Sequence, residues 1–437
     1  MTVMDLIYKV DDKVPGEKLL FYSLQHVIVF MSAGVAVTVV VGTALGLPIS
    51  EVSAMMQRAF FMAGVFSLLQ VCFGHRYPII EGSAGLWASM ILLLATSMGG
   101  RLQTFRTDLW AGVLVGGAIV VIITLAGLMP YIFKLFTNAV NGVILMLMVL
   151  QISSSIMRGM AGLTAENAYL DNKSVLIFFF TVAAILILNF AARGFIKSIA
   201  ALIGTAIGWL ASIPLGLAKA PSGGEGFFTL PQVFAFGAPT WNPGIVVVSL
   251  FTTFVLLSMV YSGMMAMSDV VDKKIDPRGL KKGFLLHGLG ALFSGIIPVV
   301  PMMPYIISAG TVVMTGVASR RPMFTAGLLL LVMGLVAPVG SLFAAIPIPV
   351  GYAVMTVMFS LIFKQGLVEV GRASAVYPDR IGYVVGISMI IGVGAMFLPF
   401  ETFTQLPGVL PYLFSNGLID GTIVVIVLDR ILLKKPG

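Results

Sequence analysis

The chain is dominated by long apolar runs that short polar segments separate. Twelve of these runs approach or exceed the roughly 20 residues that a membrane-crossing helix needs. They cover Leu20–Leu47, Ala54–Phe73, Leu109–Leu128, Val140–Ile156, Val175–Ala192, Ser198–Leu217, Gly244–Met267, Phe284–Val300, Met323–Leu342, Val350–Phe363, Ile381–Leu398 and Leu410–Leu433. The pattern predicts an all-α polytopic membrane protein with short connections.

Two further apolar stretches, Tyr77–Thr96 and Pro301–Ala318, carry proline and glycine near one end. Proline cannot donate a helical hydrogen bond, and it favours an extended conformation at the residue before it. We therefore expect an extended segment followed by a short helix in each stretch. Counting both stretches gives fourteen spans.

The composition fits a chain embedded in a lipid bilayer. Hydrophobic residues make up 59% of it and charged residues 10%, whereas soluble domains carry about 25% charged residues. The net charge of +8 comes from Lys and Arg between apolar runs, which is typical of loops at an anionic leaflet and not of a nucleic-acid binder. One cysteine and three scattered histidines predict no disulfide, no metal and no cofactor.

Charge also predicts the orientation. With both termini in the cytoplasm, 20 of the 26 Lys and Arg residues fall on the cytoplasmic side, as the positive-inside rule requires. The exceptions are Arg58, Arg101, Arg106, Arg158, Lys173 and Lys219. The N-terminal residues lack the basic-then-apolar order of a cleavable signal, so we expect the first span to direct insertion.

The two interrupted stretches resemble each other. Residues 77–85 and 304–310 both combine an aromatic residue with proline, continue with two isoleucines and end in Ser-Ala-Gly. They would be the third and tenth spans, so we expect an inverted repeat of seven plus seven: residues 20–217 and 244–433, joined by a connector at 218–243. Broken spans at matching places indicate the midplane site of a transporter.

Extended backbone at membrane depth must face protein or water, because it cannot satisfy its own polar groups. Pro78 and Pro304 favour extension, Gly85 and Gly310 allow another group to approach, and each following short helix presents free N–H groups at its N-terminus. A small polar ligand could bind there. The alternative is a pair of proline-kinked helices with an accidental likeness.

Glu81 lies inside the first broken span, where a carboxylate costs about 2.5–3.5 kcal/mol. We expect it to contact substrate or to take part in proton coupling; alternatively, it lies near the interface and caps the following helix. His26, in the first span, is a second candidate for proton coupling, although a structural histidine would give the same pattern. We interpret His75 and His287 as structural.

Ser258, Tyr261 and Ser262 share one helix face, because they are spaced by three and four residues. Their hydroxyls would either contact a ligand or bond within the helix packing. Trp87 and Tyr305 flank the broken segments, where they could stack on a planar ring or anchor helices at the interface.

Several of these segments resemble the nucleobase/ascorbate transporters. The resemblance lies in Gln25-His26, in the run from Gly74-His75-Arg76 to Gly85-Leu86-Trp87, in Gly159–Leu163 and in Ser308–Gly316. The second of these is similar to bacterial uracil and xanthine permeases. The resemblance implies a core domain of spans 1–4 and 8–11 and a gate domain of spans 5–7 and 12–14. It also implies substrate between short antiparallel strands in spans 3 and 10, and a homodimer through the gate domains.

The chain departs from that family's pattern at ligand-facing positions. Ile307 replaces a frequent carboxylate or amide, Ser308 replaces asparagine, and Ser258 and Ser262 stand where the resemblance places Glu and His. We therefore expect Glu81 to supply the missing acid. The expected substrate-binding residues are Glu81, Ser83, Ala84, Gly85, Trp87, Ser258, Ser262, Tyr305, Ile307, Ser308, Ala309 and Gly310, with Glu81 and His26 in proton coupling.

These observations predict a cell-membrane permease that imports a nucleobase such as uracil or xanthine by alternating access. Coupling to protons is expected, with sodium as the alternative ion. An anion carrier of the sulfate or bicarbonate type is the rival within transport, and Glu81 argues against it by repelling an anion. The sequence has no HExxH, no paired intramembrane aspartates and no Ser/His dyad on adjacent spans, so we expect no enzyme. A pore would need a continuous polar lining, and the spans are too apolar for one.

Overall fold

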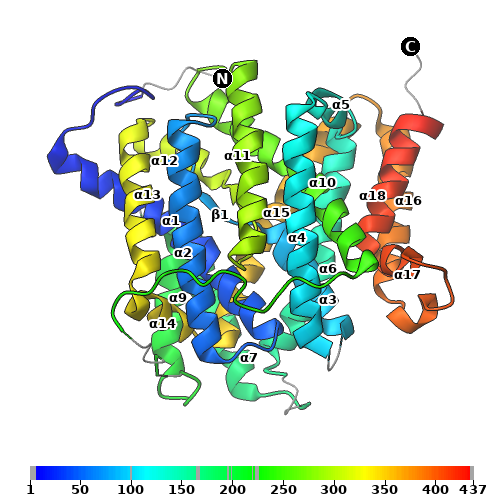
Figure 1. Cartoon of the computed structure of the whole chain (residues 1–437), viewed down its shortest axis with the longest axis horizontal. Helices are drawn as coiled ribbons and strands as arrows, with labels where there is room; N and C mark the ends of the chain where they lie inside the picture. The colour runs from blue at the N-terminus through cyan, green and yellow to red at the C-terminus, as the bar shows by residue number, and fades with distance from the viewer. Residues whose placement is uncertain are drawn as a thin grey trace.

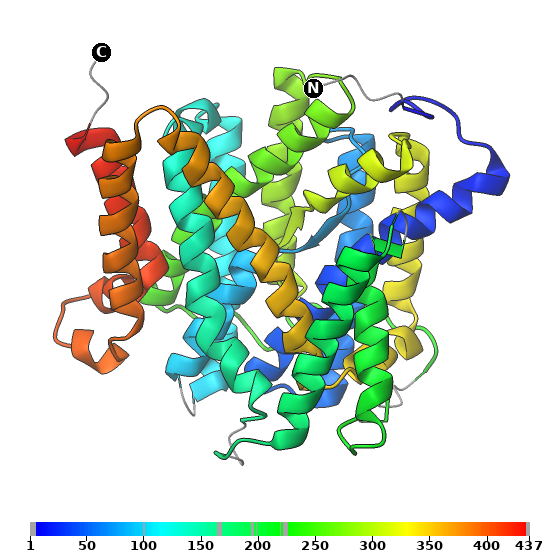
Figure 2. The same cartoon turned by 180° about the vertical axis from the view of Figure 1, so that it is seen from behind.

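The computed structural model describes residues 6–98, 101–163, 168–193, 196–197, 199–218, 220–221 and 226–433. Most of them lie in upright helices that form one bundle (Figures 1 and 2). The helices are α1 (Gly16–Ala44), α2 (Ile49–Cys72), α3 (Gly85–Met98), α4 (Leu102–Leu125), α5 (Met129–Phe133), α6 (Asn138–Met160), α7 (Asn172–Ala191), α9 (Ala200–Ser212), α10 (Pro243–Val270), α11 (Pro277–Ile296), α12 (Ile307–Thr315), α13 (Arg320–Leu335), α14 (Ala337–Ala344), α15 (Ile348–Ser374), α16 (Pro378–Met396), α17 (Leu410–Phe414) and α18 (Gly417–Val427). A 3₁₀ turn (Phe400–Phe403), a π-helical turn (Leu428–Leu432) and two strands, β1 (Glu81–Ser83) and β2 (Met302–Pro304), complete the described elements.

Eight of the described helices are long and apolar enough to cross a membrane: α1, α2, α4, α6, α7, α10, α15 and α16. Each of the twelve apolar runs contains at least one helix. The prediction of a mostly helical, multi-pass membrane protein is confirmed.

Several helix boundaries differ from those of the apolar runs, and two of the differences matter for the site and the C-terminal helices. α15 continues from the apolar run through Lys364 and Glu369 to Ser374, because helical hydrogen bonding does not require apolar side chains and no proline intervenes before Pro378. The last apolar run is divided: α17 ends at Phe414, and Asn416 caps the start of α18 by accepting a hydrogen bond from the Ile419 N–H.

The two strands form a small antiparallel sheet near the middle of the molecule, where Figure 1 labels β1. Glu81 lies opposite Pro304, and Ser83 lies opposite Met302. In each broken stretch an extended segment precedes a short helix, α3 after β1 and α12 after β2. In the second stretch the extended part ends earlier in the motif, because α12 already begins at Ile307.

Glycines bring the helices around this sheet into close contact. A Cβ on Gly64 of α2 would lie 2.4 Å from the backbone nitrogen of Leu331 in α13, and one on Gly117 of α4 would lie 2.3 Å from that of Leu292 in α11. Small residues let membrane helices approach until backbone meets backbone. The α2–α13 and α4–α11 pairs are therefore tightly packed walls on either side of the sheet.

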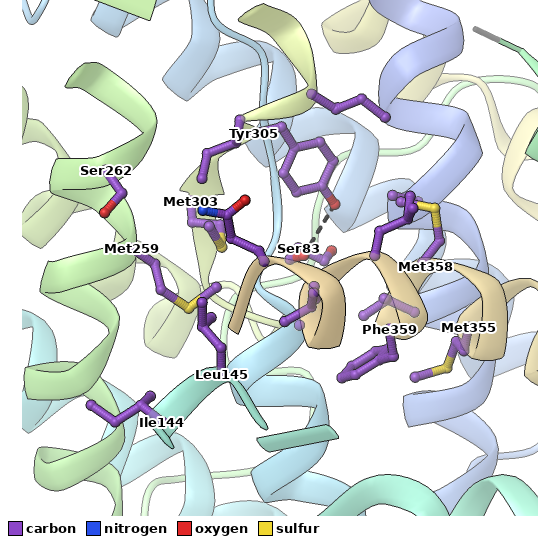
Figure 3. Close-up of a pocket in the computed structure, with 18 of the residues that line it drawn as sticks. Ser83, Ile144, Leu145, Met259, Ser262, Met303, Tyr305, Met355, Met358 and Phe359 are labelled. Atoms are coloured by element: carbon purple, nitrogen blue, oxygen red, sulfur yellow. Dashed lines mark hydrogen bonds between the residues drawn. The ribbon is translucent and has the colours of Figure 1, made fainter. Parts of the chain in front are cut away.

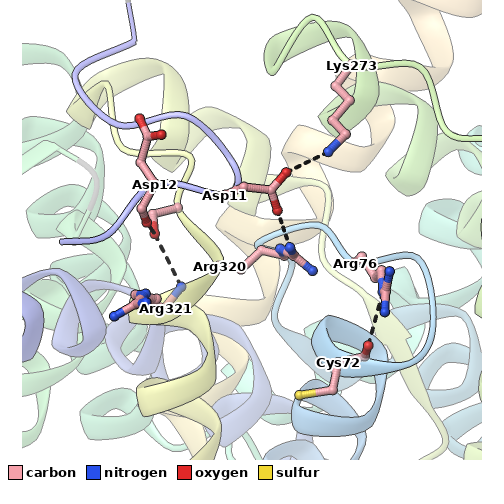
Figure 4. Close-up of polar contacts among 8 residues, drawn as sticks. Asp11, Asp12, Cys72, Arg76, Lys273, Arg320 and Arg321 are labelled. Carbon is pink, nitrogen blue, oxygen red and sulfur yellow. Dashed lines mark hydrogen bonds and ion pairs between the residues drawn. The ribbon is translucent and has the colours of Figure 1, made fainter.

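The N-terminal segment before α1 runs across one end of the bundle. Its backbone pairs with the chain between α12 and α13: the Ile7 N–H donates to Gly316 over 2.8 Å, and the Ala318 N–H donates to Tyr8 over 2.8 Å. The Asp11 carboxylate pairs with Arg320 at the start of α13 and with Lys273 after α10, the latter over 2.8 Å (Figure 4). The segment thus links two helices that are distant in sequence.

Candidate functional site

The paired strands satisfy backbone groups that would otherwise be unpaired at depth. Besides the sheet itself, the Ala84 N–H donates to the Pro301 carbonyl over 2.8 Å, and the Tyr305 N–H donates to the Ile80 carbonyl over 2.9 Å. Both strands are buried throughout. Non-helical backbone is tolerated at membrane depth when protein surrounds it in this way.

Tyr305 fixes the geometry of the sheet. Its hydroxyl donates to the Ser83 carbonyl over 3.0 Å, as the dashed line in Figure 3 marks. Its ring occupies the space where a side chain at position 82 would stand, since a Cβ on Gly82 would lie 2.3 Å from the ring. Glycine is therefore required at position 82 for the ring to reach Ser83.

A cavity of about 340 Å³ lies beside the sheet (Figure 3). One wall comes from α1, β1, β2, the start of α12 and α10, and the opposite wall comes from α6 and α15. Methionines and aliphatic residues make up most of the lining, together with Phe359. An apolar cavity of this size with few polar groups is typical of a small-molecule site.

The cavity is closed at depth and open toward one end of the bundle. Its deep part is formed by buried residues such as Ser83, Met355 and Phe359, whereas Leu361 and Gln365 further along α15 are exposed. This open end lies where α6 begins and where α10 and α15 end. Lys134, Lys273 and Arg372 stand at those helix ends, so the opening faces the basic end of the molecule.

Six of the predicted substrate-binding residues line this cavity: Ser83, Gly85, Ser258, Ser262, Tyr305 and Ile307. The Ser83 hydroxyl is buried and has no hydrogen-bond partner among the described residues. The hydroxyls of Ser258 and Ser262 donate to carbonyls of their own helix, those of Val255 and Ser258, and keep only acceptor capacity for a ligand.

The other predicted residues lie outside the lining of the cavity. They are His26, Glu81, Ala84, Trp87, Ser308, Ala309 and Gly310. The Ser308 hydroxyl instead accepts the Ile80 N–H over 3.2 Å, which ties α12 to the chain before β1. Trp87 and His26 are buried, each with one ring nitrogen unpaired in the described part of the chain.

The two short helices differ in the N–H groups that they offer. The Ser308 and Ala309 N–H groups donate to the carbonyls of Tyr305 and Ile306, so the expectation that they are free is wrong. Both N–H groups form hydrogen bonds of the tight turn at the start of α12, so neither is available to a ligand. In α3 the first helical hydrogen bond runs from the Ala88 N–H to the Ala84 carbonyl. The N–H of Gly85 comes before it and therefore has no partner within the helix, and Gly85 lines the cavity.

Three polar residues in the lining, Asn141, Gln365 and Glu369, were not predicted. The buried Asn141 side-chain carbonyl has no hydrogen-bond partner among the described residues. Glu369 accepts from Gln365 over 2.8 Å and from Arg372 over 3.1 Å. Asn141 could have been predicted, because it is a polar residue inside an apolar run. Gln365 and Glu369 could not, because they follow the end of the apolar run and therefore resemble loop residues, although α15 continues through them.

Glu81 is the first residue of β1, and its side chain, which does not line the cavity, lies close to His75. The His75 Nε2 atom is 3.9 Å from the Glu81 Oε1 atom, and both side chains are buried. The Glu81 backbone N–H donates to the Ser67 hydroxyl of α2 over 2.9 Å. His75 lies in the turn between α2 and β1 and is buried, next to the exposed Arg76.

Fold and cavity together define a multi-pass membrane protein with an apolar cavity between two groups of helices. Residues 17–401 match the model of the permease family that is named for xanthine and uracil permeases. The chain belongs to this family, the nucleobase/ascorbate transporters.

Similar proteins cover nearly the whole chain. YwdJ of Bacillus subtilis (strain 168), whose name assigns it provisionally to purines, is 29% identical over 94% of this chain and 96% of its own length. The uric acid permease PucK of the same organism is 26% identical over 96% of both. The transmembrane domain of the cyanobacterial bicarbonate transporter BicA shares the fold, with a TM-score of 0.60 at 15% identity over 96% of this chain and 99% of that one.

Proposed function

We propose that the protein is a secondary active transporter that imports a nucleobase, such as uracil, xanthine or a related purine, with protons. The observation that carries the proposal is the cavity beside the β1–β2 sheet in a chain of the permease family. The names of its relatives, which include purine, uric acid and xanthine permeases, support a base as the substrate.

The cavity offers the kinds of group that a planar base needs. The Ser83 hydroxyl can donate or accept, the Asn141 side chain can do both, and the Gly85 N–H can donate. The rings of Tyr305 and Phe359 also line the cavity and suit the face of a heterocycle. We assign recognition to these groups and to the remaining predicted lining residues, Ser258, Ser262 and Ile307. The buried residues Ala84, Trp87, Ser308 and Ala309 would support them by packing. Gly310 is exposed and receives no role in recognition.

Alternating access would result from movement of the two walls of the cavity relative to each other. We assign the wall of α1, the sheet, α10 and α12 to a core domain, and α6 and α15 to a gate domain. The helix contacts support fourteen spans in two inverted repeats, because each helix pair of one kind has a counterpart with the two halves exchanged. The α2–α13 pair corresponds to the α11–α4 pair, and the α1–α13 pair corresponds to the α10–α4 pair. A homodimer through the gate domains would complete the assembly.

The orientation follows from charge. The open end of the cavity is flanked by lysines and arginines, and the positive-inside rule assigns such an end to the cytoplasm. In the cell membrane the described conformation would then be open to the inside. Both chain ends, near residues 6 and 433, lie at this same end (Figure 1).

We propose that Glu81 carries the coupling proton, with His26 as a second candidate. Glu81 is buried in the same strand as Ser83 but does not line the cavity, so its charge would influence the site without touching the base. In a low-dielectric interior an unpaired carboxylate is costly, which favours binding a proton before or with the substrate.

The rival function is transport of sulfate or bicarbonate on the same fold. A likeness at 15% identity bears on the fold alone. The described lining contains no Lys or Arg and includes the carboxylate Glu369, which disfavours an inorganic anion.

Uptake into proteoliposomes tests the proposal. Uracil, xanthine, adenine and sulfate are each supplied with an acid-outside gradient, with a sodium gradient and without a gradient. The proposal expects saturable uptake of at least one base, accelerated by the proton gradient and insensitive to that gradient in Glu81→Gln. Sulfate uptake without base uptake would overturn the substrate class, and an unchanged pH response in Glu81→Gln would overturn the coupling role.

A further inference from the structure

Outside the lining of the cavity, two buried titratable side chains face each other. The exposed fraction is 3% for His75 and 2% for Glu81. The Nε2 and Oε1 atoms are 3.9 Å apart, within ion-pair range but beyond a hydrogen bond, and neither has a hydrogen-bond partner among the described residues. A buried donor and acceptor left unpaired cost free energy, so their shared orientation needs a reason.

The backbone fixes which nitrogen of His75 carries the proton. The Tyr77 N–H donates to the His75 Nδ1 atom over 3.0 Å, so Nδ1 is the acceptor. A neutral imidazole has one donor and one acceptor nitrogen, and Nε2 must therefore carry the hydrogen that points toward Glu81.

The ring and the backbone of His75 each have a further contact that holds the residue in place. Tyr77 stacks on His75 with ring centroids 6.1 Å apart and an interplanar angle of 22°. The His75 backbone N–H contacts the Gln70 Oε1 atom over 3.4 Å, while the Gln70 Nε2 atom donates to Gly283 of α11 over 3.0 Å. The donor is thus directed at Glu81 by contacts with α2 and α11.

Two hydroxyl groups near the β1–β2 sheet bond to backbone groups, and neither bonds to Glu81 in the described chain. The Tyr305 hydroxyl donates to Ser83, and the Ser308 hydroxyl accepts from Ile80. Within the described chain, Glu81 forms no ion pair with Lys or Arg. His26 on α1 and His287 on α11 are buried on helices that contact β1 and β2, yet neither forms an ion pair with Glu81.

We infer that His75 stabilises the ionised form of Glu81 through its Nε2–H group and so sets the pH at which this carboxyl releases its proton. The inference rests on the proposed coupling role of Glu81. His75 is a positioning residue and not a relay, because its Nδ1 atom is occupied by Tyr77 and cannot take up a second proton without losing that bond. Ionisation of Glu81 would draw the two side chains into a hydrogen bond.

The test compares the pH dependence of uptake in His75→Phe and His75→Gln. Phenylalanine keeps the ring but removes the donor, so the carboxylate loses its stabilisation and the pH midpoint should rise by about one unit. Glutamine retains an N–H donor and should restore part of the shift. His287→Phe, the same change at another buried histidine, should leave the midpoint in place.

A second measurement does not depend on transport. Infrared titration of the purified protein follows the protonated-carboxyl band that disappears in Glu81→Gln, and the midpoint of this band should rise in His75→Phe. An unchanged band midpoint would overturn the role of His75, whatever the uptake shows. A shifted band together with no uptake of any base would instead leave the pair intact and overturn the proposed function.

Discussion

Among the groups to which we assign recognition, the Ser83 hydroxyl is one with unused hydrogen-bonding capacity. It is buried, it lines the deep part of the cavity, and it lacks a partner in the described chain, while the carbonyl of the same residue is held by Tyr305. A hydroxyl with unused donor and acceptor capacity at such a place gains a bond when a base enters.

Replacing this hydroxyl should weaken binding and leave the fold intact. Ser83→Ala loses one neutral hydrogen bond, worth about 0.5–1.5 kcal/mol, and should raise the Kd for the transported base by about 2–10-fold. Equilibrium binding to the purified protein measures the change. Ser294→Ala removes a buried serine hydroxyl that bonds its own helix and does not line the cavity, so its Kd should match that of the unmodified protein. Equal affinity in Ser83→Ala would remove Ser83 from the site.

Four of the predicted residues that line the cavity belong to the repeated motif: Ser83, Gly85, Tyr305 and Ile307. The motif could be recognised because proline and glycine mark the place where extended backbone gives way to a short helix. His75 and Glu369 could not be assigned, since their roles depend on which distant group each side chain meets, and hydropathy carries no such information.

At the scale of elements, the β1–β2 pair depends on one residue without a side chain. Gly82→Ala would place a methyl group against the Tyr305 ring and displace its hydroxyl from Ser83. Overpacking of this kind costs about 1–3 kcal/mol. We expect a lower Tm and a loss of base binding of more than about tenfold.

Gly310→Ala is the matched change on the other broken stretch. A Cβ at Gly310 meets no atom within 4 Å, and alanine favours a helix, so Tm should stay the same or rise slightly. Thermal unfolding in detergent measures both variants. The same change of Tm in Gly82→Ala and Gly310→Ala would contradict the claim that the Tyr305 ring needs a glycine at position 82.

The elements themselves were predictable as far as hydrophobic runs define them. The short strands were expected only through a resemblance, because three-residue strands carry no periodic signal. The end of α15 was missed because the helix leaves the apolar region before it stops, and its last turns carry Gln365 and Glu369 to the mouth of the cavity.

At the scale of the whole molecule, the N-terminal segment joins the end of α10 to the start of α13 through Asp11. The hydrogen bond from Lys273, together with Arg320, lowers the pKa of the Asp11 carboxyl below its ordinary value of 3.8. A lowered pKa in the folded state means that the pairing stabilises the protein above pH 3.8 and that this contribution is lost as the pH falls below it.

Asp11→Asn should therefore lower stability at pH 7 and have no effect below the folded-state pKa of Asp11. The carboxylate is 55% exposed, so the loss should be about 0.2–1 kcal/mol and should shrink as salt is added. Thermal unfolding over a range of pH and salt provides the measurement. Asp272→Asn, at a neighbouring exposed aspartate outside the described ion pairs, is the control. A salt-independent loss would contradict the electrostatic account.

The most direct test of the central claim is substrate protection of a cysteine placed in the cavity. The chain has one cysteine, Cys72, which lines a different cavity at the basic end, so Cys72→Ser provides a cysteine-free background. In that background Ser262→Cys should react with a polar thiol reagent, and the transported base should slow the reaction severalfold. Cys72 in the otherwise unmodified protein should react at the same rate with and without base. Reaction of Ser262→Cys at one rate whether or not the base is bound would contradict the placement of the base between the sheet and α15.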